Sequence, residues 1–150
     1  MEGNAVTRRE ARESAFLAAF SATFQPEQPQ EAIRDCGEMQ EVAQDAFASQ
    51  LLLAMNQHAE EIDETITAHL KGWALNRLPR VSLTAMRLAL AEMLYGAEQK
   101  PAVAINEAVE LVKKYGDEND YQFVNGLLGA VAREKAGIPG EPVSPDIETC

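Results

Sequence analysis

Hydrophobic residues recur at helical spacing along most of the chain, most clearly between Pro101 and Val131. Two apolar stripes there follow the i, i+3, i+4, i+7 pattern of one α-helix face. The stripes are Ile105, Ala108, Val109 and Val112, then Val124, Leu127, Leu128 and Val131. Between them, Gly116 suits a left-handed helix end, and Asn119 or Asp120 suits the next N-cap. The segment therefore predicts a helical hairpin with apolar inner faces.

Two asparagines, Asn106 and Asn125, lie close beside these stripes. A buried or half-buried amide needs hydrogen-bond partners, so it tends to fix local geometry. We interpret both as structural amides that join helix ends. Direct ligand contact is the alternative.

Five further helices are predicted by the same spacing, at residues 11–24, 29–36, 38–56, 59–70 and 82–95, with a short turn at 73–78. Thr7 and Glu10 fit a capping box, and Ser82 is a good N-cap. Phe16, Phe20 and Phe24 are expected to form one core-facing stripe. The helix after Ser82 is apolar enough to be central. With no strand signature, the fold class is all-α with about seven helices.

The length of 150 residues fits one domain, and 46% hydrophobic with 25% charged residues is typical of a globular chain. We expect a flexible N-terminus at 1–6, a helical domain at 7–137 and a disordered acidic tail at 138–150. Cys36 and Cys150 lack metal-ligand spacing, so no metal, cofactor or structural disulfide is expected. No catalytic constellation appears, so we expect no enzyme.

The charge and hydropathy of the chain limit what it can bind and where it is located. The net charge of −11 argues against non-specific nucleic-acid binding, although a local basic site remains compatible with it. No apolar run nears the ~18 residues of a membrane span. The N-terminus also lacks the order of a signal peptide. We therefore expect no membrane association and a cytoplasmic location.

Two elements are candidates for binding. Arg8, Arg9 and Arg12 begin the first helix, where guanidinium groups and free N–H groups suit phosphates. Taken alone, three arginines interleaved with Glu10 and Glu13 are more typical of a solvated helix start, with Arg9 able to pair with Glu13. The second element is the joint near Phe123. Its ring either stacks on an unpaired base or belongs to the core.

Longer motifs narrow these alternatives. They are Arg8-Arg9-x-Ala11-Arg12-Glu13, Val81-x5-Arg87-Leu88-Ala89 with Glu92-Met93, and the run from Val103 to Leu111 with Lys114-Tyr115-Gly116 and Phe123 to Leu128. Their order and spacing over residues 7 to 137 resemble the NusB family of transcription antitermination factors. Phe20 departs from the family, which has a tyrosine there, and Ala91-Glu92-Met93 replaces the usual Tyr-Glu-Leu.

The resemblance implies two packed helical bundles and binding to boxA-type single-stranded RNA of ribosomal RNA leader transcripts. It implies a heterodimer with NusE, a small-subunit ribosomal protein, facing the region around Trp73 to Met86, and attachment to the RNA polymerase elongation complex. It assigns RNA contacts to Arg8, Arg9, Arg12, Arg87 and Phe123.

The hypothesis is therefore a non-catalytic, RNA-binding transcription antitermination factor. The first alternative is a divergent NusB paralogue that acts as a helical protein-interaction module or homodimer without RNA binding. A second alternative is the RNA-targeting domain of a methyltransferase. This chain lacks the Gly-rich cofactor-binding region that such an enzyme requires.

Overall fold

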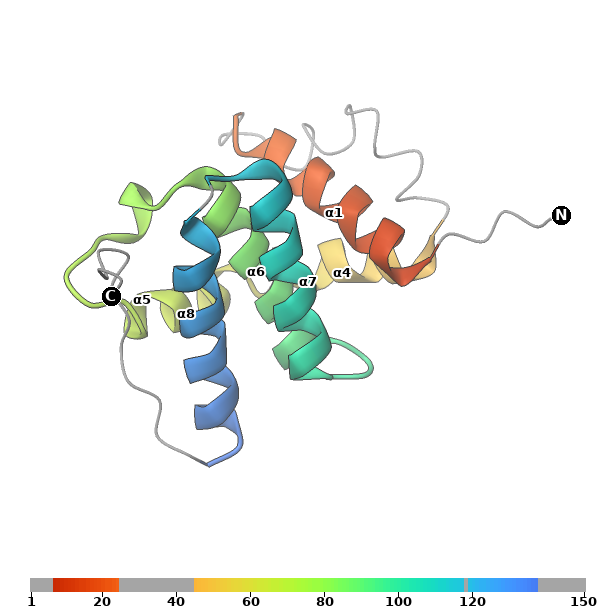
Figure 1. Ribbon diagram of the computed structural model, residues 1–150. Helices are drawn as coiled ribbons and strands as arrows, with labels where there is room; N and C mark the ends of the chain where they lie inside the picture. Colours follow the sequence, from red (N-terminus) through yellow and green to blue (C-terminus); the bar gives the residue numbers. More distant parts are fainter. Residues whose placement is uncertain (1–6, 25–44, 118, 138–150) are drawn as a thin grey trace, which may run out of the picture.

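The computed structural model describes residues 7–24, 45–117 and 119–137, and they are helical throughout most of their length (Figure 1). The elements are α1 (Arg8–Ala22), α4 (Ala46–Gln57), α5 (Ala59–Ala68), a 3₁₀ turn (Leu75–Arg77), α6 (Arg80–Tyr95), α7 (Pro101–Tyr115) and α8 (Asp120–Lys135). This confirms the all-α class. The predictions for residues 1–6, 29–36 and 138–150, and for Cys36 and Cys150, lie outside the described residues.

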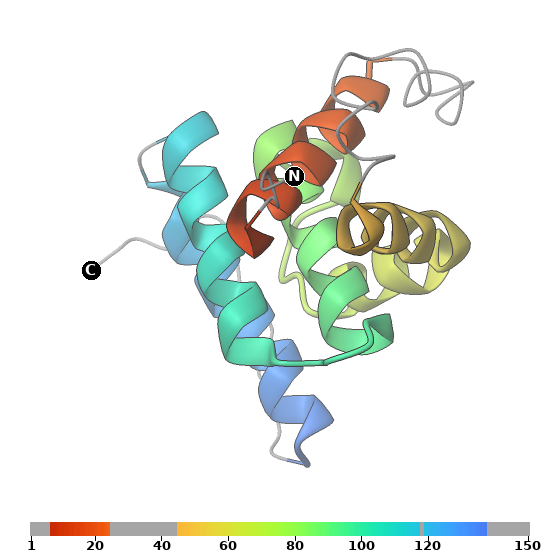
Figure 2. The same cartoon turned by 90° about the vertical axis from the view of Figure 1, so that its right-hand side faces the viewer.

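Helix α6 is the centre of the structure, as its apolar pattern predicted. It packs against α1, α4, α5, α7 and α8, and Met86, Leu90 and Met93 are fully buried. Figure 2 shows α7 and α8 on one side of α6 and α4 and α5 on the other, with α1 across the top of both groups. Two groups of helices therefore share α6 as a common wall.

The start of α1 follows the predicted capping box. The Thr7 hydroxyl accepts from the Glu10 N–H at 3.0 Å, and the Thr7 N–H donates to Glu10 Oε1 at 3.0 Å. Phe16 is fully buried, but Phe24 is 58% exposed, so its predicted core position is wrong. The helix ends at Ala22, and Phe24 then lies edge-on to Phe20.

Helix α6 begins earlier than predicted. Pro79 holds the N-cap position, and its carbonyl accepts from the Leu83 N–H at 2.9 Å. Ser82 is therefore inside the first turn and completely buried, and its hydroxyl has no hydrogen-bond partner. The prediction that Ser82 caps this helix is wrong because the fixed φ of Pro79 starts the helix first.

The joint between α7 and α8 also differs from its prediction. Gly116 has φ −106°, which is not left-handed, and Asn119 caps α8 without a side-chain hydrogen bond. The space for a side chain at 116 is tight: an added Cβ would lie 3.0 Å from the Val112 carbonyl oxygen and 3.2 Å from Val81 Cγ1. Asn106 and Asn125 are exposed, so they are not the buried structural amides that the stripes suggested.

Candidate nucleic-acid interface

The first two turns of α1 place three arginines in three different settings. Arg8 is exposed, and its guanidinium carbon lies 4.2 Å from the centroid of the Phe47 ring on α4. This is the distance of a cation–π contact. Among the described residues the structure records no carboxylate partner for Arg8. Within that part of the chain, no carboxylate occupies the hydrogen-bond donors of Arg8.

Arg9 reaches α7 instead of its own helix. Its Nε and Nη2 donate to the two carboxylate oxygens of Glu107, each at 3.0 Å. These hydrogen bonds raise the pKa of Arg9 above its ordinary value. The predicted pairing of Arg9 with Glu13 is wrong, because Glu13 accepts from Lys114 and Tyr115. The Arg9 side chain remains 66% exposed, so an incoming anion can reach it.

Arg12 forms a buried ion pair with Glu92 of α6. Its Nε and Nη2 donate to Oε1 and Oε2 at 2.8 and 2.6 Å, and each side chain is only 11% exposed. The hydrogen bonds to Glu92 raise the pKa of Arg12, and burial opposes this shift. The same guanidinium carbon lies 5.0 Å from the Phe47 centroid. Arg12 therefore joins α1 to α6, and sequence reasoning missed Glu92 as its partner.

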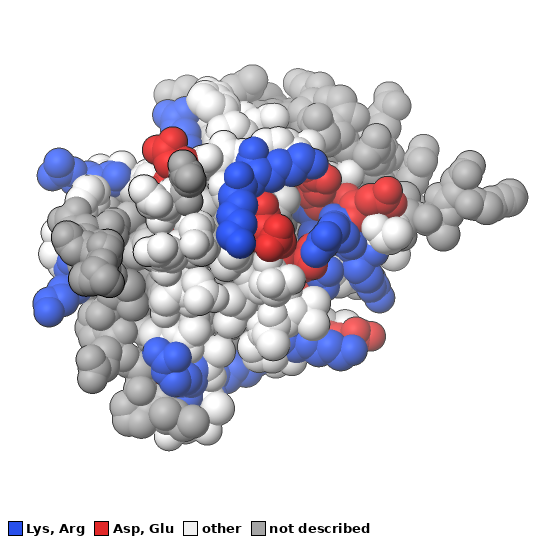
Figure 3. All heavy atoms as spheres, in the orientation of Figure 1, with Lys and Arg blue, Asp and Glu red and all other residues white. Residues whose placement is uncertain are grey.

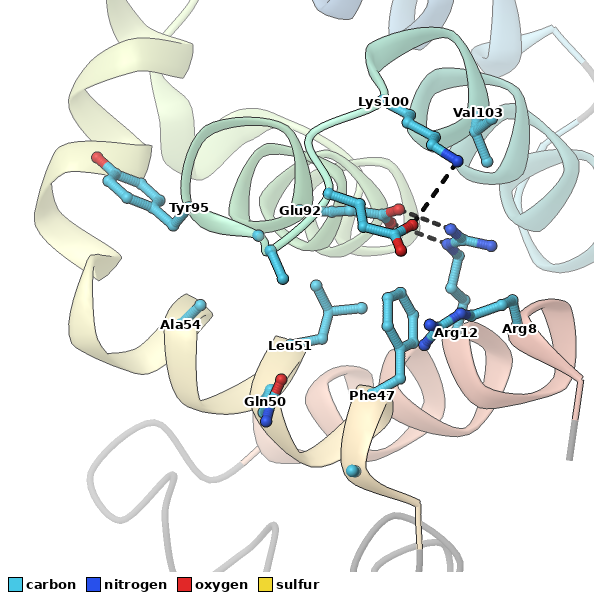
Figure 4. A pocket seen from close by; sticks show the side chains of 14 residues that line it. Arg8, Arg12, Phe47, Gln50, Leu51, Ala54, Glu92, Tyr95, Lys100 and Val103 are labelled. Atoms are coloured by element: carbon cyan, nitrogen blue, oxygen red, sulfur yellow. Dashed lines mark hydrogen bonds and ion pairs between the residues drawn. The ribbon is translucent and has the colours of Figure 1, made fainter. Parts of the chain in front are cut away.

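A cleft of about 570 Å³ opens beside these arginines, between α4 and the connection from α6 to α7. Figure 4 shows the Phe47 ring standing between Leu51 and the two guanidinium groups of Arg8 and Arg12. The residues that line the cleft include Gln50, Ala54, Tyr95, Glu98, Lys100 and Val103. No periodic pattern marked Phe47 or Gln50 as more than helix residues, so the sequence could not reveal this cleft.

The charged surface around α1 and α7 is mixed rather than uniformly basic. Figure 3 shows lysine and arginine side chains interleaved with aspartate and glutamate on this face. The pairs Arg9–Glu107 and Lys114–Glu13 account for part of that pattern. An anion at this surface must therefore compete with neighbouring carboxylates for the paired cations.

The two remaining predicted contacts lie elsewhere. Arg87 donates from Nε and Nη2 to Asp63 of α5 at 2.8 and 3.0 Å. It is five residues from Glu92, which puts the two about 140° apart around α6. Phe123 is 7% exposed and belongs to the hydrophobic core. The geometry gives both residues structural contacts and leaves their RNA contacts as predictions.

The described residues contain no group of three or more His, Cys, Asp or Glu side chains that could hold a metal ion. None of their helices has the length and apolar character to cross a membrane.

The family model described as NusB family matches residues 9–133. Transcription antitermination protein NusB of Lysinibacillus sphaericus is 36% identical over 128 residues, which cover 85% of this chain and 98% of that protein.

Solved structures agree with the sequence comparison. NusB of T. maritima has 29% identity and a TM-score of 0.75, with 87% of this chain and 94% of that chain covered. A crystal structure of the antitermination factors NusB and NusE in complex with dsRNA contains a chain with 33% identity and a TM-score of 0.74; 85% of this chain and 96% of that one are covered. From the matched family model, the extent of the relatives and the shared fold, this chain belongs to the NusB family.

Proposed function

We propose that this chain is a non-catalytic transcription antitermination factor that binds boxA-type single-stranded RNA of ribosomal RNA leader transcripts together with NusE. Family membership supports this function, as does the related NusB that was crystallised with NusE and dsRNA. The observation that carries it is the state of Arg8. This guanidinium is exposed at the start of α1, lies over Phe47, and has no carboxylate partner among the described residues.

Arg8 and Arg9 are the proposed phosphate contacts. Arginine forks match phosphate oxygens in a bidentate manner, and the positive end of the α1 dipole adds to their attraction. Arg9 must exchange Glu107 for a phosphate. The cost of that exchange is small, because an exposed ion pair in water contributes little.

Arg12, Arg87 and Phe123 contribute to the proposed function mainly by holding the surface in place. Arg12 fixes α1 to α6 through Glu92, and Arg87 fixes α6 to α5 through Asp63. Phe123 packs in the core beside the α7–α8 joint. Direct RNA contact by these three would require breaking those interactions first.

The proposed NusE-facing surface lies at the other end of α1, around the region from Trp73 to Met86. Arg80 lies over the exposed ring of Phe24 at 4.5 Å, and Arg77 lies over the ring of Trp73 at 5.6 Å. Phe24 is exposed and Trp73 is half-buried, and aromatic and arginine side chains are typical of the anchors that protein interfaces use. Through NusE the complex would attach to the RNA polymerase elongation complex, in the cytoplasm where transcripts form. A second copy of the chain is the competing partner for the same surfaces.

A salt titration tests the RNA-binding proposal. The probe is a boxA-type single-stranded RNA, measured with and without NusE at several salt concentrations. Two phosphate contacts predict that log K falls with log salt at a slope of about −1.4, since each contact to a single strand contributes about −0.7. Arg8→Ala and Arg9→Ala are measured separately, and each should remove about half of that slope. An unchanged affinity and slope in both variants would overturn the proposal.

A further inference from the structure

The cleft beside Arg8 has the build of a ligand site, and its long walls are apolar. Phe47, Leu51 and Ala54 of α4 form one side. Val103 and Tyr95, which has one ring face stacked on His58, lie on the other side. A volume of about 570 Å³ falls within the roughly 300–1,000 Å³ typical of clefts that hold small ligands or single groups of larger ones. The walls therefore suit a flat, weakly polar group.

Charge at the mouth of the cleft favours an anion next to that group. Arg8 lines one end, and Lys100 lines the opposite wall (Figure 4). Glu98 forms an ion pair with Lys100, but the two charged atoms are 3.7 Å apart and both side chains are about two-thirds exposed. Such a pair contributes little and yields readily to a phosphate.

The buried end of the cleft carries no free charge. Glu92 and Arg12 line it, and each satisfies the other through two hydrogen bonds. Gln50 is exposed on the α4 wall, and its amide can both donate and accept. One such amide can pair with the donor and acceptor groups on the edge of a nucleobase.

From this arrangement we infer that the cleft takes one unstacked base of the bound RNA. The base lies between the α4 wall and Tyr95, its edge meets the Gln50 amide, and the adjoining phosphate lies between Arg8 and Lys100. The inference rests on the proposed RNA binding and gives it a specificity element. Sequence-specific recognition of RNA depends on such splayed bases, whereas contacts to phosphates carry no sequence information.

An abasic scan tests the inference. A 12-nucleotide boxA-type RNA is titrated with the full chain and NusE, intact and with each base removed in turn. One position is expected to lose affinity by about tenfold, the effect of removing one stacked base. The scan is repeated with Ala54→Leu, which places a larger side chain in the cleft, and with Gln50→Ala. Gln57→Ala on the exposed end of the same helix is the matched control.

Two results would support the inference. Ala54→Leu should bind intact RNA about tenfold more weakly than the parent chain, and removing the critical base should then lower the affinity of that variant by less than twofold. Gln50→Ala should show a smaller, position-specific loss, and Gln57→Ala none. Normal RNA binding by both cleft variants, with the same abasic profile as the parent chain, overturns the base site and leaves the RNA-binding function standing. A parent chain that binds no RNA overturns both. If Ala54→Leu changes only the self-association of the chain and leaves RNA binding unchanged, the cleft binds a second copy of the chain, and the inference is overturned.

Discussion

Glu92 of α6 accepts two hydrogen bonds from Arg12 of α1, at 2.8 and 2.6 Å, where each side chain is 11% exposed. A residue of the motif that suggested RNA binding is therefore committed to a helix–helix contact. Loss of Arg12 would lower RNA affinity through the position of α1 even without any contact to RNA.

Arg12→Ala is expected to destabilise the fold by about 3 kcal/mol, because it leaves Glu92 buried without a partner. Glu92→Gln should destabilise by less, because the amide oxygen can still accept a hydrogen bond from Arg12 and the guanidinium stays partly paired. Urea unfolding followed by circular dichroism measures both. Arg9→Ala is the control and should leave the midpoint nearly unchanged. Equal midpoints for Arg12→Ala and the parent chain would contradict the structural role.

Glu107→Gln is expected to strengthen RNA binding. The change removes the carboxylate that occupies Arg9, so the guanidinium no longer has to exchange partners. An increase in affinity of about two- to fivefold corresponds to the strength of an exposed ion pair. Glu64→Gln on α5 changes the net charge equally but touches none of these arginines. If both variants bind RNA equally well, general charge rather than Arg9 explains the effect.

Acid should weaken the contact between α1 and α7. Hydrogen bonds from Lys114 and then from Tyr115 lower the pKa of Glu13 below its ordinary value near 4.5. A carboxylate with a lowered folded-state pKa stabilises the fold above its unfolded pKa, and this contribution disappears as pH falls through the folded value. The free energy of unfolding should therefore decline below about pH 4.5, and Glu13→Gln should reduce that decline. Measuring unfolding from pH 7 to pH 3 tests this; parallel curves would refute it.

Two glycine substitutions should have opposite signs. Gly116→Ala is expected to destabilise by about 1–3 kcal/mol, because its Cβ would press on Val81 and on the Val112 carbonyl. Gly129→Ala in the middle of α8 meets only the Arg133 Nη1 atom at 3.6 Å. It should stabilise by roughly 0.5–1 kcal/mol through helix propensity. Thermal unfolding of both variants compares them directly, and loss of stability in both would contradict the space argument.

Helix positions and the central place of α6 could be predicted because apolar spacing records which face is buried. The capping box of α1 was predictable because it depends on two residues that are close in sequence, Thr7 and Glu10. Helix ends depended on competition that spacing does not show: Pro79 started α6 before Ser82 could cap it. At Gly116 the backbone is not left-handed, and the small size of glycine instead leaves room for the Val81 side chain, which is distant in sequence.

The candidate site was predictable in part. The arginines of α1 were identified from the motif, but the carboxylate partners of Arg9 and Arg12 lie 98 and 80 residues away, on α7 and α6. Such long-range pairs leave no periodic signal in a single sequence. The cleft with Phe47 likewise arises only when α1 and α4 meet, so its residues could not be selected from spacing.

Helix α1 buries seven residues, and five of them are alanines. Small side chains remove little apolar area from water, so Phe16 and the buried link from Arg12 to Glu92 supply much of what holds this helix. The exposed links to Glu107 and Lys114 add a smaller contribution. Ionic links to exposed partners weaken with salt, whereas the apolar seam between α7 and α8 does not. Amide hydrogen exchange in α1 should therefore accelerate with salt while α8 stays protected. The helix that carries Arg8 would then be the part of the molecule whose order depends on the salt concentration around it.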